Sequence, residues 1–284
     1  MTVPNSLHVR SRRRRPLGLL VLVTVVVLAA VGVVVWIAMR GASAATVTLR
    51  DPVKREIAME LVASAENSTL AWYERYDYIE DIDDGRGYTG GLVGFTSGTH
   101  DMLMLIERYT DEVPENTLAA FLPALRAVDG TDSHDGLGEP FEQAWRAEAA
   151  EPAFQQAQRD EVDRLYFEPA VSRAIEDGLG VLGQFAYFDA MVMHGDTGFA
   201  DVRAQALQAQ DTPAAGGDER DYLSAFLDAR VVEMKKEEAH EDTSRVDTAQ
   251  RVFLDAGDLS LDPPLRWSVY GDPFEILSDP PSRW

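Results

Sequence analysis

Residues 65–103 read AENSTLAWYERYDYIEDIDDGRGYTGGLVGFTSGTHDML, a helical pattern that gives way to short strand-like runs separated by glycines. Two carboxylates stand at this change: Glu66 near the end of the predicted helix and Asp84 in a glycine-rich turn. Cleavage of a glycosidic bond needs one carboxylic acid and one ionised carboxylate that acts as base or nucleophile. Glu66 and Asp84 are therefore candidate catalytic residues, although solvated helix ends and ordinary hairpin turns carry the same residue types.

The predicted helix before Glu66 begins after Asp51, a favourable N-cap residue that precedes a proline at the first helical position. Val53, Ile57 and Leu61 then recur at helical spacing. Glu66 lies at the edge of this apolar stripe and in the last helical turn, where apolar neighbours and the helix dipole both disfavour a negative charge. Such a setting suits a general acid.

The segment Asp84-Gly85-Arg86-Gly87 is predicted to form a turn, because glycine readily adopts positive φ. The backbone N–H groups of this turn and the Arg86 cation would both stabilise a negative charge on Asp84. The runs 88–89 and 92–96, separated by Gly90-Gly91, are predicted to be short strands. The hydroxyl of Thr89 could hold a water molecule beside the turn.

The chain from Asp51 to Ile276 resembles the glycoside hydrolase family 46 chitosanases. The resemblance rests on AENSTL around Glu66, YIEDIDDGRGYTGGLVGF around Asp84 and GTHDM around Asp101, and it continues through DGLGVLGQFAYFDAMVMHG and LDPPLRWSVYGDPFEI. It implies an α+β, mostly α-helical, two-lobed lysozyme-like fold, with a small β-sheet in the N-terminal lobe and a cleft between the lobes. It also implies endo-hydrolysis of chitosan with inversion, in which Glu66 is the general acid, Asp84 is the general base and Thr89 positions the attacking water.

Departures from the family pattern occur at three places. The family often has glycine where this chain has Asp83 and His100. The predicted loop after His194, DTGFAD, is short, which puts sugar contacts near His194 in doubt.

Substrate contacts are expected from a set of residues around the proposed cleft. Glu80, Asp81 and Asp101 are candidate partners for the ammonium groups of glucosamine, and the alternative for all three is a solvated acidic surface. We also expect sugar contacts from Arg86, Tyr166 and His194.

Asp189 lies in the segment Val181–Met193, which is apolar on nearly all sides and predicts a buried helix. A buried carboxylate requires a cationic partner, and Arg230 and Arg245 are the candidates. We expect these three residues to form a structural ion network that braces the cleft rather than to take part in catalysis.

The chain has 284 residues and a net charge of −22. This charge disfavours binding to nucleic acid and favours cationic polymers, although many soluble proteins are acidic only for solubility. There is no cysteine, so disulfides and cysteine nucleophiles are excluded. The acidic and histidine residues of 237–241 lack a second histidine at useful spacing, and we expect no metal and no cofactor. The protein is expected to be a monomer.

The first 44 residues are predicted to be a targeting segment, followed by a catalytic domain over 45–284. Arginines at 12–15 precede the uncharged run Leu17–Met39, and Ala42-Ser43-Ala44 follows. This pattern predicts a secretory signal cleaved near Ala44 and a secreted, extracellular enzyme. The apolar run is also long enough to span a bilayer, so an uncleaved membrane anchor with the catalytic domain outside is the alternative.

The remainder of the chain is predicted to be mostly helical. Helices are expected over about 153–177 with a bend near Pro169, over 218–238, and over 243–256 with a glycine end at Gly257. The tail from Leu261 is rich in proline and is expected to be extended. Two other functions are compatible with the residues alone: a lysozyme-like hydrolase of acetylated polymers such as chitin or peptidoglycan, and a non-catalytic, membrane-anchored binder of cationic polymers.

Overall fold

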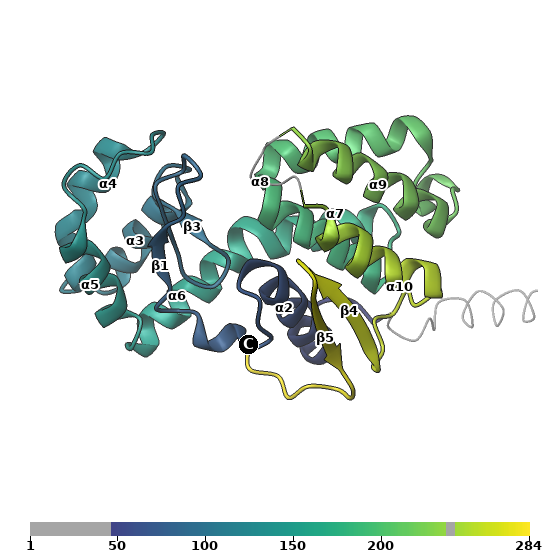
Figure 1. Cartoon of the computed structure of the whole chain (residues 1–284), viewed down its shortest axis with the longest axis horizontal. Helices are drawn as coiled ribbons and strands as arrows, with labels where there is room; N and C mark the ends of the chain where they lie inside the picture. Colours follow the sequence, from purple (N-terminus) through teal and green to yellow (C-terminus); the bar gives the residue numbers. More distant parts are fainter. Residues whose placement is uncertain (1–46, 237–241) are drawn as a thin grey trace, which may run out of the picture. The chain divides into compact units, whose positions relative to one another are not determined.

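The computed structural model describes residues 47–236 and 242–284, which belong to one compact unit, Val47–Trp284. The predicted targeting segment, 1–44, lies outside these residues. Within the unit, the helices and strands gather into a smaller and a larger lobe (Figure 1). The α+β, mostly helical, lysozyme-like fold expected from the sequence is confirmed.

The smaller lobe surrounds a three-stranded antiparallel sheet with the order β1-β2-β3. Its elements are β1 (Ile79–Asp81), β2 (Tyr88–Gly90), β3 (Phe95–Thr96), α3 (Asp101–Glu112), η2 (Thr117–Phe121), α4 (Leu122–Val128) and α5 (Glu139–Glu148). Of the two predicted strands, 88–89 extends to Gly90 in the structure, whereas 92–96 is shortened to Phe95–Thr96. Gly90 belongs to β2, residues 91–94 form the turn to β3, and β1 was not predicted as a strand.

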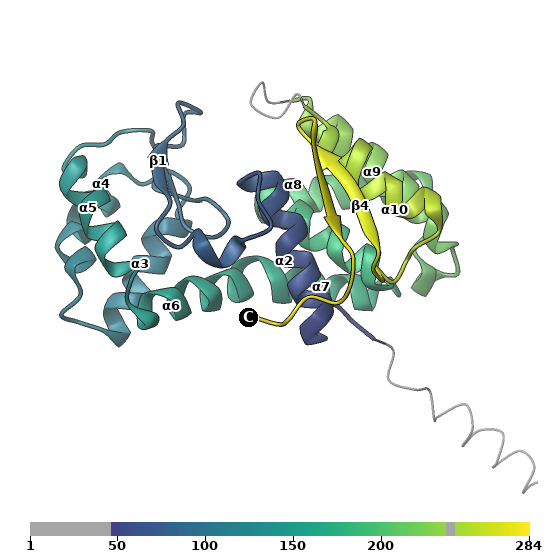
Figure 2. The same ribbon diagram turned by 60° about the horizontal axis from the view of Figure 1, so that its bottom comes forward.

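The larger lobe is built from helices and a second, two-stranded sheet (Figure 2). Its elements are α2 (Pro52–Glu66), α7 (Glu168–Glu176), α8 (Val181–Ala209), η4 (Pro213–Ala215), α9 (Glu219–Met234), η6 (Arg245–Gln250), α10 (Arg251–Ala256), β4 (Leu265–Val269) and β5 (Asp272–Ile276). The short helix η1 (Trp72–Glu74) follows α2. In the described residues, no helix combines the length and apolarity that a bilayer crossing requires.

A continuous helical rod joins the two lobes. It consists of α6 (Pro152–Val162), the π-helical turn η3 (Asp163–Phe167) and α7. The predicted bend near Pro169 therefore takes the form of a π-helical turn just before the proline. Pro169 itself lies in the first turn of α7, where a helix tolerates the missing backbone N–H of proline.

Two expectations about the C-terminal half were wrong. The DTGFAD segment is not a loop, because α8 continues through it to Ala209 and is interrupted only at Gly195, whose φ is 65°. The tail is not simply extended, because β4 and β5 form an antiparallel hairpin in which Val269 pairs with Asp272. The prolines of the tail obscured this hairpin, but Pro273 lies in β5, a strand with only one neighbour, where proline is tolerated.

Helix α2 begins and ends as the sequence predicts. The Asp51 carboxylate accepts hydrogen bonds from the N–H groups of Val53 and Lys54, and Glu66 is the last helical residue. The helix is buried along most of its length, and Trp267 of β4 donates to the Ser64 hydroxyl at 2.9 Å. These contacts fix the end of the helix, and therefore the backbone of Glu66.

The other face of α2 carries two acidic residues that pack under the C-terminal residues. Glu56 is fully buried and accepts hydrogen bonds from the Trp72 indole at 2.9 Å and the Arg283 N–H at 2.7 Å. Glu60, one turn further on, is also buried. Burial raises the pKa of Glu60 to about 7, with a further contribution from the Glu56 charge and an opposing one from Arg283.

We therefore expect Glu60→Gln to stabilise the protein at neutral and alkaline pH. Because the folded-state pKa lies above the ordinary value, the native state binds more protons than the unfolded state between about pH 4.5 and 7. The free energy of unfolding should fall as pH rises through this window, and the glutamine should recover roughly 1–3 kcal/mol at pH 8. Urea unfolding at pH 4.5 and 8 measures this effect, with the exposed Glu74→Gln as control. A variant with the same pH dependence as the unaltered protein would contradict it.

Candidate active site

The Glu66 side chain forms an ion pair with Arg245 across 179 positions of sequence. The Arg245 Nη1 lies 2.5 Å from Glu66 Oε1, and 24% of the Glu66 side chain is exposed. Apolar surroundings were predicted for this helix end, and the cation was not predicted. No local pattern could have revealed it, because Arg245 lies in η6 and reaches Glu66 only in the folded chain.

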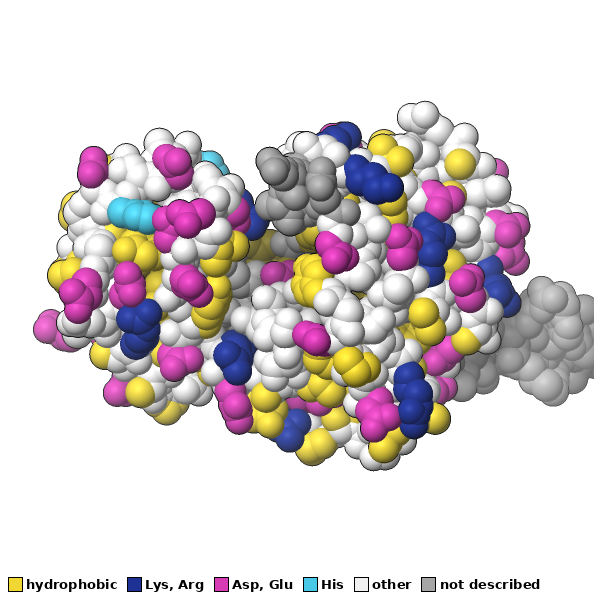
Figure 3. All heavy atoms as spheres, viewed as in Figure 1, with side chains coloured by type: hydrophobic (Ala, Val, Ile, Leu, Met, Phe, Trp, Pro, Cys, Tyr) yellow, Lys and Arg dark blue, Asp and Glu magenta, His cyan; other side chains and the backbone are white. Residues whose placement is uncertain are grey.

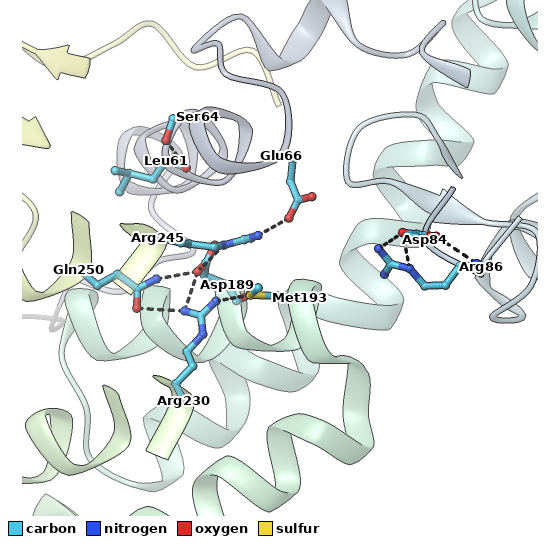
Figure 4. Close-up of polar contacts among 10 residues, drawn as sticks. All are labelled: Leu61, Ser64, Glu66, Asp84, Arg86, Asp189, Met193, Arg230, Arg245 and Gln250. Carbon is cyan, nitrogen blue, oxygen red and sulfur yellow. Dashed lines mark hydrogen bonds and ion pairs between the residues drawn. The ribbon is translucent and has the colours of Figure 1, made fainter. Parts of the chain in front are cut away.

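Arg245 also belongs to a buried network centred on Asp189 (Figure 4). Arg245 Nη2 and Arg230 Nη1 each lie 2.7 Å from an Asp189 oxygen, and the Gln250 amide donates to the same carboxylate at 2.6 Å. Burial alone would raise the pKa of Asp189, but the two arginines lower it to about 2. The two cations of the network, Arg230 and Arg245, are thus balanced by the carboxylates of Asp189 and Glu66.

Asp84 is held by its own turn. Its Oδ1 accepts the Arg86 N–H at 3.0 Å, and its Oδ2 accepts Arg86 Nε at 2.8 Å and Nη2 at 2.5 Å. Only 6% of the Asp84 side chain is exposed. Gly87 is required in this turn, because its φ is 74° and a Cβ there would lie 2.4 Å from the Ser97 hydroxyl. Arg86 therefore orients Asp84, and its expected contact with substrate stays a prediction.

Thr89 lies in the centre of the small sheet, opposite Glu80 of β1 and Thr96 of β3. The residue is buried, and its hydroxyl makes no hydrogen bond to any residue that the structure describes. A buried hydroxyl without a protein partner is uncommon and suits the binding of water.

Asp101 and Tyr166 contact each other beneath the surface. Asp101 accepts hydrogen bonds from the N–H groups of Thr96 and Met102 at 2.9 Å and from the Tyr166 hydroxyl at 2.8 Å. Burial raises the pKa of Asp101, and these hydrogen bonds oppose that shift. Burial and the Asp101 charge hold the pKa of Tyr166 well above its usual value. Both residues are committed to internal contacts, and their expected roles in substrate binding stay predictions.

Glu80 and Asp81 line a pocket of about 600 Å³ along β1, together with Tyr78 and His134. The His134 Nε2 lies 3.3 Å from Asp81 Oδ2, and the His134 ring stacks on Tyr88 at 4.3 Å. His134 was not predicted as a site residue. Its contact with Asp81 joins segments 53 positions apart, for which spacing gives no signal.

His194, half-buried, immediately precedes the interruption of α8 at Gly195. The structure thus places it in α8, and its expected contact with substrate stays a prediction. Asp83 and His100, where the family often has glycine, have φ values of 58° and 73°, in the region that glycine favours. No group of three or more acidic, histidine or cysteine side chains suited to a metal ion occurs within the residues described.

Glu66 and Asp84 come from different lobes, and Figure 4 shows their side chains on opposite sides of the space between α2 and the small sheet. The surface is hollowed between the two lobes (Figure 3). Two carboxylates on opposite walls of a groove can act on opposite sides of a bound chain, one as a proton donor and the other as a base.

The chain is similar to known proteins both in sequence and in fold. The model of glycosyl hydrolase family 46 matches residues 60–265. A chitosanase of a Streptomyces species is 61% identical over 234 residues, which are 81% of this chain and 84% of that protein. A chitosanase crystallised with substrate is similar at a TM-score of 0.80 and 55% identity, covering 81% of this chain and 99% of that one. A Gynuella sunshinyii chitosanase in complex with chitotetraose has a TM-score of 0.72 and 36% identity, covering 78% and 96% of the two chains.

Proposed function

The chain belongs to glycosyl hydrolase family 46 and is an endo-acting hydrolase of chitosan, and we propose that Glu66 is its general acid and Asp84 its general base. The observation that supports this assignment most strongly is the placement of the two carboxylates on different lobes, each oriented by an arginine. In this proposal Glu66 donates a proton to the oxygen of the leaving sugar. Asp84 accepts a proton from the water that attacks the anomeric carbon from the other side.

Arg245 has a clear part in this proposal. When Glu66 gives up its proton it becomes a carboxylate, and the Arg245 guanidinium 2.5 Å away stabilises the charge that develops. Asp189 holds Arg245 in place from the opposite side. Glu66 must be protonated again before the next turnover, and its 24% exposure gives it access to solvent.

The unpartnered hydroxyl of Thr89 supports its role in holding the attacking water. Thr89 lies in β2, the strand that follows the Asp84 turn, and in this proposal a water bonded to its hydroxyl lies beside the base. A water between base and sugar requires room, so we propose that the reaction inverts the anomeric centre, with the carboxyl groups separated by at least ~6.5 Å when substrate is bound.

Glucosamine units are cationic, and the walls of the proposed cleft are rich in acidic residues. Glu80 and Asp81 line the pocket beside β1 and remain the proposed partners of substrate ammonium groups. The net charge of −22 would also attract a polycation over a longer range, an effect that salt weakens.

The release of reducing ends from chitosan, chitin and bacterial cell wall, measured in parallel, tests the proposed substrate. We expect hydrolysis of chitosan and little or none of the acetylated polymers. Faster cleavage of chitin or cell wall would favour a lysozyme-like hydrolase of acetylated chains. Binding of chitosan without release of reducing ends would favour a non-catalytic binder.

We further propose that the protein is exported as a monomer and that the mature chain begins near Ala45. The basic residues before the apolar run, and the small residues at 42–44, support cleavage by a signal peptidase. Mass spectrometry of the culture supernatant should find a chain that starts close to Ala45. Recovery of only the full-length chain, in the membrane fraction, would support the anchor instead.

A further inference from the structure

The tip of the β4–β5 hairpin carries an aromatic residue in an unfavourable backbone conformation. Because Val269 pairs with Asp272, Tyr270 and Gly271 form a two-residue turn, with φ values of 55° and 88°. Such turns favour asparagine, aspartate or glycine at the first position, and a bulky side chain at positive φ is an outlier. Outliers of this kind are found preferentially at functional sites, which favours a functional role for Tyr270.

Hydrogen bonds connect this turn to the segment that contacts Glu66. The Tyr270 N–H donates to the Ser244 hydroxyl at 2.8 Å, and the following residue, Arg245, forms the ion pair with Glu66. The Thr248 hydroxyl donates to the Ser268 carbonyl at 2.6 Å and holds the strand before the turn. Tyr270 therefore lies in the large lobe, beside the segment that carries Arg245 and within electrostatic range of the Glu66–Arg245 pair.

The Tyr270 side chain is available to a ligand. It is 49% exposed, and no residue in the described parts of the chain hydrogen-bonds to its hydroxyl. Burial of part of the ring raises the pKa of Tyr270. The charge of Arg245 opposes this shift and the charge of Glu66 adds to it, so the phenol lies within electrostatic range of the Glu66–Arg245 ion pair. Single exposed apolar residues need no explanation by themselves. The strained turn and the position beside Glu66 distinguish this one.

We propose that Tyr270 contacts the sugar unit bound beside Glu66 and contributes to substrate affinity. Its ring would pack against the apolar face of the sugar, and its hydroxyl would hydrogen-bond to a sugar hydroxyl or amino group. This inference rests on the proposed function, since it takes the ligand to be a glucosamine polymer. It names Tyr270 as a substrate-contacting residue, with no part in the proton transfers.

The substitution Tyr270→Asn separates binding from folding, because asparagine is well suited to the first turn position. We expect its melting temperature to equal or exceed that of the unaltered protein. KM for chito-oligosaccharides should rise about 3- to 10-fold, as for loss of an aromatic contact, with little change in kcat. Tyr270→Phe should show a smaller rise, because it keeps the ring. Leu277→Asn, an exposed apolar residue just beyond β5, is the control and should change neither value.

Calorimetric titration of chitohexaose into the Glu66→Gln protein, with and without Tyr270→Asn, measures affinity in the absence of turnover. A Kd that rises with KM supports the inference. An unchanged Kd and an unchanged KM would overturn the inference. It would also be overturned if the melting temperature fell and if Tyr270→Asn and Tyr270→Phe lost kcat equally, because the effect would then be structural. If the unaltered protein does not cleave chitosan at all, the proposed function fails, which is a different outcome from failure at Tyr270 alone.

Discussion

Glu66→Gln should abolish chitosan cleavage while leaving the protein folded. Glutamine has the shape of glutamate and can still accept a hydrogen bond from Arg245, but it cannot donate a proton to the leaving oxygen. Loss of a general acid costs on the order of 100- to 10,000-fold in rate. The stability effect should be small, because the Glu66 side chain is partly exposed and Arg245 keeps its pairing with Asp189.

The experiment compares reducing-end release and thermal unfolding of the two proteins. Glu112→Gln is a matched control, since Glu112 is an exposed glutamate that ends α3 as Glu66 ends α2. The control should retain full activity. A Glu66→Gln protein with native-like melting and undiminished activity would reject Glu66 as the acid.

Asp189→Ala should destabilise the protein by roughly 3–5 kcal/mol, because it leaves two buried guanidinium groups without their shared carboxylate. Arg230 is fully buried and Arg245 nearly so, and Glu66 can compensate only one of them. Urea unfolding measures the loss. Asp201→Ala is the control, because Asp201 lies on the same helix, α8, but is exposed.

A double-mutant cycle of Asp189→Ala and Arg245→Ala tests whether the network acts as a unit. Residues that share one network should show an interaction energy of about 0.5–3 kcal/mol. Strictly additive losses would mean that Asp189 and Arg245 stabilise the protein independently, contrary to the contacts described above.

The local features of the site were predictable because each depends on neighbours in sequence. Asp51 as N-cap, the end of α2 at Glu66 and the glycine-rich turn at Asp84 all follow from residue types within a few positions, and the structure confirms these local elements. The burial of Val181–Met193 followed from its composition in the same way, and the need for a cation at Asp189 followed from that burial.

The contacts across long stretches of sequence were not predictable. Nothing near Glu66 indicates that a guanidinium from η6 meets it, and this contact replaces the apolar setting inferred from α2 alone. Asp101 was expected either to bind an ammonium group of the substrate or to belong to a solvated acidic surface, yet its burial and its bond to Tyr166 depend on packing between α3 and η3. The β4–β5 hairpin was missed because nearby prolines outweighed the alternation of Leu265, Trp267 and Val269.

In the proposed mechanism, Asp84 activates a water on the side of the sugar opposite Glu66. Proton NMR of freshly cleaved chito-oligosaccharide tests it most directly, because the anomeric configuration of the new reducing end is visible before mutarotation. The β-linked substrate should give the α anomer first, as inversion requires. Initial formation of the β anomer would contradict the account, because Asp84 would then act as a nucleophile and not as the base that activates water.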